Sequence, residues 1–359
     1  MSILKQPLND IPDGLDVALI VRGIAAYQVL IWHTVGFDVT GWAAKLFMVS
    51  GRQCVWVFFT LSGYLIAYGF YYGRYPLNVA GIKRFYAARL LRIVPLYLFL
   101  TLLTVASLFA VGAAQEITPA RVIRALLFLS VDHVYPGPFW TLVLEFWFYV
   151  LFPLFAWIIF MIPEHRRLSI SIGMYLALGL VPHLMTLNFG HSLDNRTLVG
   201  NFSHFFAGIL ILLLAKQIQT AAQNIGPRRL LWHCFTLAAV LLIFTTYWYH
   251  AHQVLFYVLG GFTTDLMALA LLVIHKVVEI HDRPPRPILQ YLSVLGILAY
   301  GIYAWHGFLL VVVPELTGKL ATVSIISIML AWLSYSLIER PMLTWRKNHL
   351  LVDLPGKVR

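Results

Sequence analysis

Long hydrophobic runs separated by short polar segments dominate this chain. A helix needs about 20 mainly apolar residues to cross the hydrocarbon core of a bilayer. Windows near that length predict transmembrane helices at residues 17–36, 53–72, 92–111, 138–161, 168–187, 202–216, 230–248, 253–276, 291–313 and 319–338. The pattern therefore predicts an all-α, polytopic membrane bundle of about ten spanning helices.

Two runs are shorter than the rest. Residues 202–216 are short for an independent span, and residues 122–129 are too short to cross, so we expect them to form an interfacial or re-entrant segment. No polar segment is long enough for a soluble domain, and no basic region precedes the first run. We therefore expect one integral membrane domain over residues 1–359, without an appended soluble domain or a cleavable signal peptide.

Composition excludes the soluble and disordered classes of protein. Hydrophobic residues make up 60% of the chain and charged residues only 11%, and the mean hydropathy is +0.80. Soluble domains carry roughly 45–50% apolar and about 25% charged residues. A chain with this much apolar surface and so little charge belongs in a membrane.

The positive charge of the chain has two explanations. The formal net charge is +11, from 26 Lys and Arg against 15 Asp and Glu, a balance that also suits a nucleic-acid-binding protein. An even number of spans puts both termini on one side, however, and most of the basic residues then fall on that side. Because basic residues accumulate on the cytoplasmic side, this asymmetry predicts cytoplasmic termini and no nucleic-acid partner.

Few ionisable side chains lie inside the predicted spans. A charge there costs about 2.5–3.5 kcal/mol on insertion scales, so each one is a candidate functional group. They are Arg22 and His33 in the first span, Glu145 in the fourth, Asp265 in the eighth and His306 in the ninth, with His183 and His204 in the fifth and sixth. His183 and His204 are interpreted as core or interface residues, and the role of Asp265 is left open.

Helical geometry and topology bring three of these groups to one depth. Arg22 and His33 are eleven residues apart, about three turns, so they share one helical face and lie roughly 16 Å apart along the axis. With a cytoplasmic N-terminus, Arg22 lies in the inner half of the membrane. His33, Glu145 and His306 then lie together in the outer half, which predicts one site with Arg22 beneath it.

These residue types fit acid–base chemistry. A histidine is the most available general base at neutral pH, a buried carboxylate can orient it, and an arginine binds phosphate or carboxylate through a planar fork. No nucleophile-elbow serine or cysteine and no metal-binding histidine motif is present, so we expect no covalent intermediate and no metal. Acyl transfer to a hydroxyl fits this set of groups, and so does a proton relay in a transporter.

Six segments resemble, in order, those of the acyltransferase-3 family of integral-membrane O-acyltransferases, the type that acetylates bacterial polysaccharides. They are LDVALIVRGIAAYQVLIWHTVG, with Arg22 and His33; VWVFFTLSGYLI, with Ser62 and Gly63; RFYAARLLRIVPLY, with Arg89, Arg92, Pro95 and Tyr97; WTLVLEFWFYVLFP, with Trp140, Glu145, Tyr149 and Pro153; AYGIYAWHGFLL, with Tyr303 and His306; and SYSLIERP, with Glu339 and Pro341. The chain departs from the family pattern at Trp56, where many members have an acid, and at Phe146 and Trp147. We expect these departures to alter packing or acceptor fit rather than chemistry.

The resemblance implies transfer of an acyl group, usually acetyl, from cytosolic acyl-CoA to a carbohydrate hydroxyl, as in exopolysaccharide or O-antigen. The donor is acyl-CoA, usually acetyl-CoA in this family. It is then a co-substrate rather than a permanently bound cofactor. The other partners are a glycan or lipid-linked glycan and the lipids of the bacterial inner membrane. His33 is the expected general base, Glu145 orients or charges it, and Arg22 binds the donor or fixes its path.

The resemblance also suggests which residues bind the two substrates. It implies donor binding by Arg22, Arg89, Arg92 and Ser62, and acceptor binding by Trp140, Tyr149 and His306. Each of these residues can also be explained without a substrate. The arginines are explained by the positive charge of the cytoplasmic side, and the Ser62–Gly63 pair by close helix packing. The other residues are explained by packing in the core or at the membrane interface. A proton-coupled transporter of a glycan or small metabolite, and a non-catalytic membrane sensor, are the alternative functions.

Overall fold

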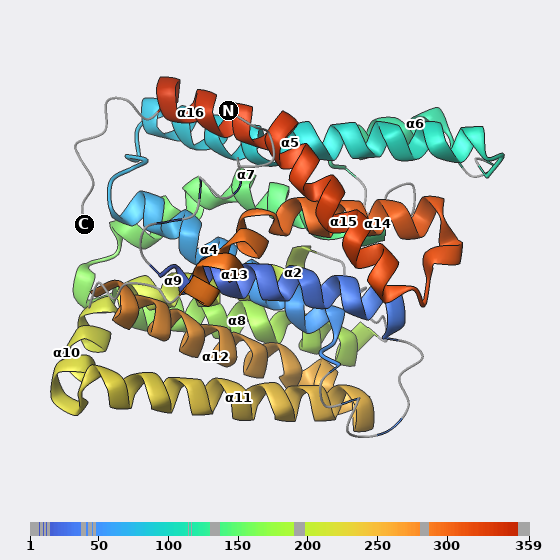
Figure 1. Cartoon of the computed structure of the whole chain (residues 1–359). Coiled ribbons are helices and arrows are strands. Elements are labelled where there is room, and N and C mark those ends of the chain that lie inside the picture. The colour runs from blue at the N-terminus through green and yellow to red at the C-terminus, as the bar shows by residue number, and fades with distance from the viewer. Residues whose placement is uncertain are drawn as a thin grey trace.

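The computed structural model describes residues 15–36, 48–113, 117–129, 137–189, 198–280 and 287–350, together with residues 7, 10, 12, 41, 45 and 115. In this part of the chain the regular elements are helices, and most of them run nearly side by side (Figure 1). The helices of the first half are α2 (Val17–Val35), α4 (Gly51–Tyr71), α5 (Val79–Ala110), α6 (Pro119–Leu126), α7 (Trp140–Met161) and α8 (Glu164–Phe189). Those of the second half are α9 (Leu198–Leu213), α10 (Ala215–Ile225), α11 (Pro227–Ala251), α12 (Gln253–Ile280), α13 (Pro287–Ile297), α14 (Ala299–Val312), α15 (Leu320–Ser334) and α16 (Arg340–Leu350).

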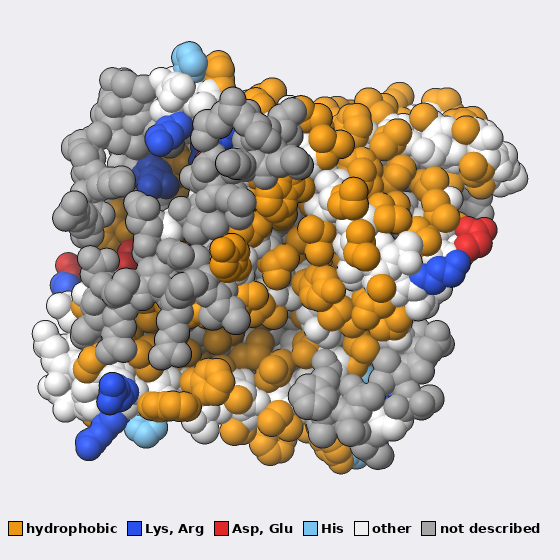
Figure 2. All heavy atoms as spheres, viewed as in Figure 1, with side chains coloured by type: hydrophobic (Ala, Val, Ile, Leu, Met, Phe, Trp, Pro, Cys, Tyr) orange, Lys and Arg blue, Asp and Glu red, His pale blue; other side chains and the backbone are white. Residues whose placement is uncertain are grey.

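The prediction of a helical membrane bundle is confirmed. Among the described residues, 7 helices are long and apolar enough to cross a bilayer, and the number reaches 9 if each of two bent pairs is one span. Hydrophobic side chains cover the middle of the face in Figure 2, with Lys and Arg side chains toward its two ends. The count of ten, the single domain and the cytoplasmic side of the termini stay predictions.

Three predicted segments differ in detail from the helices. The helix expected at 92–111 begins earlier, at Val79, because Asn78 caps a helical basic segment by accepting the N–H of Gly81 at 2.8 Å. The span expected at 291–313 is divided at Leu298, where α13 and α14 meet at 61°. The short span at 202–216 corresponds to α9, which meets α10 at 57°.

The surface of α11 is suited to lipid rather than water. This helix lies at one edge of the bundle (Figure 1), and the side chains of Trp232, Phe235 and Phe244 are 64%, 57% and 52% exposed. Large apolar side chains on a protein surface mark a site of interaction. Along a helix long enough to cross a bilayer, that interaction is contact with the acyl chains.

Glycines set the close approach of α4 and α9. A Cβ atom on Gly63 would overlap the backbone carbonyl of Phe205, and one on Gly208 would overlap the carbonyl of Thr60. Phe59 and Phe205 stack beside this contact, with ring centroids 4.4 Å apart. Small residues at such contacts let membrane helices pack backbone against backbone. The close-packing interpretation of Gly63 is therefore confirmed.

A second glycine contact places the bent pair α13–α14 on α2. A Cβ atom on Gly296 would overlap the backbone carbonyl of Leu19, so these helices touch through their backbones. α2 carries Arg22 and His33, and α14 carries His306. The contact thus fixes the position of one half of the candidate site relative to the other.

We expect Gly63→Ala to lower the free energy of unfolding by about 1–3 kcal/mol, because the added methyl group forces α4 away from α9. The measurement is the thermal unfolding midpoint of the detergent-solubilised protein. Gly173→Ala is the matched control, since a Cβ atom there meets nothing within 4 Å, and alanine favours the helix. An unchanged midpoint in Gly63→Ala would contradict the packing account.

Candidate active site

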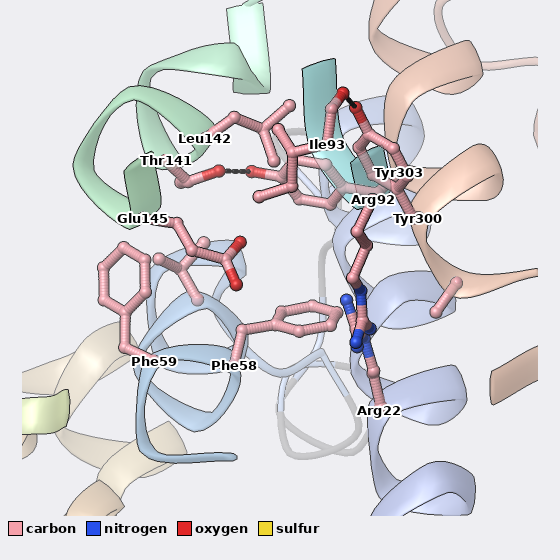
Figure 3. A pocket seen from close by; sticks show the side chains of 12 residues that line it. Arg22, Phe58, Phe59, Arg92, Ile93, Thr141, Leu142, Glu145, Tyr300 and Tyr303 are labelled. Atoms are coloured by element: carbon pink, nitrogen blue, oxygen red, sulfur yellow. Dashed lines mark hydrogen bonds between the residues drawn. The ribbon is translucent and has the colours of Figure 1, made fainter. Parts of the chain in front are cut away.

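A pocket inside the bundle is lined by side chains from α2, α4, α5, α7 and α14. Glu145 points into it from one side, and Arg22 and Arg92 point into it from the other (Figure 3). Phe58 and Tyr303 also line it. The cavity volume is about 40 Å³, which is room for a few water molecules.

Arg22 and His33 take their positions from the way α2 begins. Asp16 caps this helix by accepting the N–H of Leu19 at 2.9 Å. Three turns then separate Arg22, which lines the pocket, from His33. The Nε atom of Arg22 is buried and has no hydrogen-bond partner among the described residues. Since an unpaired buried donor is costly, this N–H is available to a water molecule or a ligand.

Glu145 is held in place by two hydroxyl groups. The Ser62 hydroxyl donates to Oε1 of Glu145 at 2.8 Å, and the Tyr149 hydroxyl, one turn further along α7, donates to the same oxygen at 2.5 Å. The Arg89 guanidinium lies 5.6 Å from the centroid of the Tyr149 ring. These contacts fix the direction of the carboxylate and leave its second oxygen open to the pocket.

Two arginines carry the positive charge of the pocket lining, and the other lining residues apart from Glu145 are uncharged and mostly apolar. Arg22 and Arg92 supply two guanidinium groups, and Ala299 and Tyr300, at the first turn of α14, line the same space. The free N–H groups of a helical first turn carry a partial positive charge. An anion, or an oxygen atom that becomes negative during a reaction, is therefore stabilised here.

A second pocket lies next to the first and extends toward α16. The two share Arg22, Arg92 and Tyr300, and the second is also lined by Glu339 and Arg346. Its cavity volume is about 190 Å³. Oε1 of Glu339 and Nε of Arg346 are buried without partners among the described residues. The two pockets therefore adjoin at Arg22, Arg92 and Tyr300, between α16 and Glu145.

His33 lies against His306 rather than against a carboxylate. Nδ1 of His33 is 3.2 Å from Nε2 of His306, and Nδ1 of His306 is 3.1 Å from the carbonyl oxygen of Ile302. His306 is fully buried. Tyr303 connects this pair to the pocket, because it lines the pocket and its ring centroid lies 5.6 Å from that of His306.

The structure brings together some of the predicted site residues and separates others. The sequence suggests that Glu145 orients His33, yet among the described residues Glu145 pairs with Ser62 and Tyr149, and His33 pairs with His306. The difference arises because hydropathy fixes the depth of a residue in the membrane but not the direction in which its side chain points around the bundle.

The remaining predicted residues lie around the pockets. Arg92 lines both of them, whereas Arg89 is buried against the rings of Phe85 and Tyr149 and lines neither. Trp140, at the start of α7, is half-buried and packs against the hydrophobic core. The side chain of His183 lies outside the described part of the structure.

Asp265, whose role the sequence left open, is the centre of a separate buried network. It accepts hydrogen bonds from Thr60 at 3.0 Å and Tyr175 at 2.9 Å, and it lies 2.9 Å from Nδ1 of His204. The ring of Trp56 stacks on His204 with centroids 5.1 Å apart. The carboxylate therefore joins α12 to α4, α8 and α9.

Two lining residues could not be identified from the sequence. Arg346 lies in a basic C-terminal segment, where topology alone explains its charge, and Tyr300 has no distinguishing signal in an aromatic-rich helix. Their position depends on the bend at Leu298 and on the path of α16. The described residues contain no group of three or more His, Cys, Asp or Glu side chains that could hold a metal ion.

A comparison with protein families matches most of the chain. The model of a family described as an acyltransferase domain matches residues 15–338. No curated protein and no solved structure gives a significant match. The family model and the geometry of the site therefore carry the functional assignment.

We expect Asp265→Ala to lower the free energy of unfolding by about 3 kcal/mol or more, because it leaves the Tyr175 hydroxyl and the His204 ring without their acceptor inside the bundle, whereas Thr60 keeps the Trp56 carbonyl. Asp265→Asn keeps one acceptor oxygen and is expected to cost less. The check is the thermal unfolding midpoint in detergent.

Glu164→Ala is the matched control for this change. Glu164 pairs with Lys216 at 2.9 Å, but the two side chains are 73% and 84% exposed, so its removal is expected to leave the midpoint unchanged. Equal midpoints for Asp265→Ala and Glu164→Ala would show that the buried network does not hold these helices together.

Proposed function

The chain belongs to the acyltransferase-3 family of membrane acyltransferases, and from this premise we propose that it moves an acetyl group from cytosolic acetyl-CoA to a hydroxyl group of a carbohydrate. The acceptor is a bacterial surface glycan such as exopolysaccharide or O-antigen, or its lipid-linked precursor, and the membrane is the bacterial inner membrane. The observation that carries the proposal is the pair of adjoining pockets, lined by Arg22, Arg92 and Arg346, that lies between α16 and the interior carboxylate of Glu145, with the His33–His306 pair beyond Tyr303.

The donor enters through the second pocket. Acyl-CoA carries several phosphate charges, and guanidinium groups bind phosphate through paired N–H donors. Arg346 and Arg92 line this pocket, and Arg22 lies where the two pockets join. The phosphates bind at Arg346 and Arg92, and the pantetheine arm passes Arg22 and Ser62 toward Glu145. Because the first pocket is narrow, side chains along it move when the arm enters.

The chemistry is direct transfer with His33 as general base. The acceptor hydroxyl oxygen attacks the thioester carbon, and its proton moves to His33 as the new C–O bond forms. Arg22, three turns along α2 from His33, holds the donor arm on its path toward that residue. The C–S bond then breaks, and the leaving sulfur takes the proton back from His33.

The surrounding residues support this reaction without forming bonds to the substrate. Glu145 balances the charge of Arg22 and Arg92, and Ser62 and Tyr149 fix its direction. Of the three residues expected to bind the acceptor, Tyr149 and His306 are buried, and Trp140, at the start of α7, is half-buried. Trp140 therefore has ring surface exposed for contact with a sugar. An aromatic face and an apolar sugar face are complementary.

The buried histidines also suit the alternative of proton-coupled transport. The pairing of His204 with Asp265 inside the bundle is the observation that favours a proton relay. The two functions differ in their products, since a transporter moves its substrate unchanged and depends on a pH gradient. An acyltransferase releases free CoA in detergent, where no gradient exists.

We expect His33→Ala to abolish acetyl transfer while the protein stays folded, with kcat lowered by about 10²–10⁴-fold. The assay follows CoA release from acetyl-CoA by the purified protein in the presence of a glycan acceptor, together with mass spectrometry of the glycan. His233→Ala, at an exposed position of α11, is the control and should retain full activity. Full acetyl-transfer activity in His33→Ala would contradict the proposed function.

We expect Arg346→Gln and Arg92→Gln to raise the KM for acetyl-CoA about tenfold or more, because each removes a charge-assisted hydrogen bond worth about 1.5–3 kcal/mol. Arg228→Gln removes an exposed arginine of α11 that lines neither pocket, and its KM should match the unaltered protein. A KM that rises equally in all three variants would indicate general attraction to the basic surface instead of a phosphate site.

A further inference from the structure

The hydrogen bonds of His306 determine which of its ring nitrogens carries a proton. Nδ1 of His306 lies 3.1 Å from the carbonyl oxygen of Ile302, one turn earlier on α14. A carbonyl oxygen can only accept, so Nδ1 must donate. In a neutral imidazole the other nitrogen is then an acceptor. Nε2 of His306 therefore presents a lone pair to His33.

This assignment fixes the tautomer of His33 as well. Nδ1 of His33 lies 3.2 Å from Nε2 of His306, and because that nitrogen accepts, Nδ1 of His33 must carry the proton. Nε2 of a neutral His33 is then unprotonated. The His33 ring also contacts the backbone of Val29, one turn earlier on α2. The carbonyl of Ile302 therefore acts, through two imidazole rings and together with this local contact, on which nitrogen of His33 can take a proton from another molecule.

The packing around His306 stabilises these tautomers of His306 and His33. His306 is fully excluded from solvent, and the Tyr303 ring lies against it with a centroid distance of 5.6 Å. Tyr303 is itself held, because its hydroxyl group bonds the Pro138 carbonyl at 2.9 Å and lies 2.8 Å from the Thr141 hydroxyl. Turning the ring over would break the contacts of both nitrogens inside the protein, where no solvent replaces them.

We propose that His306 is a positioning residue, which holds His33 in the tautomer whose Nε2 atom is the general base. This inference rests on the proposed function, because His33 needs a base role only if the protein transfers an acyl group to a hydroxyl. It gives His306 the task that a carboxylate performs in hydrolase triads. When Nε2 of His33 takes the hydroxyl proton, the Nδ1–H bond to His306 is kept, so His306 need not change its own protonation.

Two substitutions separate positioning from packing. His306→Asn places an amide near the position of Nδ1, where it donates to Ile302, but removes the acceptor that Nε2 of His306 offers to His33, so that only the backbone contact with Val29 remains. His306→Gln places an amide oxygen near the position of Nε2, where it accepts from Nδ1 of His33. We expect kcat to fall about 10²-fold or more in His306→Asn and to recover to within about tenfold in His306→Gln, with the KM for acetyl-CoA unchanged in both.

The tautomer can also be read without any activity assay. In protein labelled with ¹⁵N-histidine in lipid bilayers, solid-state NMR distinguishes a protonated Nδ1 from a protonated Nε2, and the His33 signal is the one lost in His33→Ala. We expect His33 to be protonated at Nδ1 in the unaltered protein and in His306→Gln, and to occupy both tautomers in His306→Asn.

These readouts distinguish failure of the inference from failure of the proposed function. If the unaltered protein transfers no acyl group, the proposed function fails, and the NMR experiment still tests the tautomer. If acyl transfer depends on His33 but His306→Asn retains full kcat, positioning by His306 is overturned. A His33 ring protonated at Nε2 in the unaltered protein overturns it equally.

Discussion

A charged side chain in the hydrocarbon core of a bilayer must find its partners inside the protein, and the arrangement of this bundle follows from that requirement. Glu145 accepts hydrogen bonds from two hydroxyl groups and faces two arginines across a pocket. Asp265 is held by Thr60, Tyr175 and His204. Each carboxylate therefore ties several helices together, and these ties determine which helical faces turn inward.

The two carboxylates differ in what they leave unsatisfied. Among the described residues, the Asp265 carboxylate is held by Thr60, Tyr175 and His204, and this network joins four helices. The pocket around Glu145 retains a buried Nε of Arg22 without a partner among the described residues, and the next pocket retains unpaired atoms of Arg346 and Glu339. Unpaired polar groups beside a cavity are what a binding site requires, and they distinguish the candidate active site from the structural network.

Hydropathy was sufficient to predict the class of the protein and most of its helices. The spacing of Arg22 and His33 also predicted a shared face of α2 correctly, because one regular helix connects them. The bend at Leu298 could not be predicted, since no proline marks it, and it positions both Tyr300 and His306. The same bend explains why His33 pairs with a histidine of α14 rather than with Glu145, although all three were expected at one depth.

In the reaction that we propose, an acyl-CoA donor reaches the interior of the bundle through the basic pocket beside α16. The most direct test is an electron cryo-microscopy structure of the purified protein with a non-hydrolysable thioether analogue of acetyl-CoA. We expect the phosphates to contact Arg92 and Arg346 and the arm to run past Arg22 to the pocket at Glu145. An analogue bound instead at the exposed pocket near Lys216 and Arg167, or at no fixed place, would contradict it.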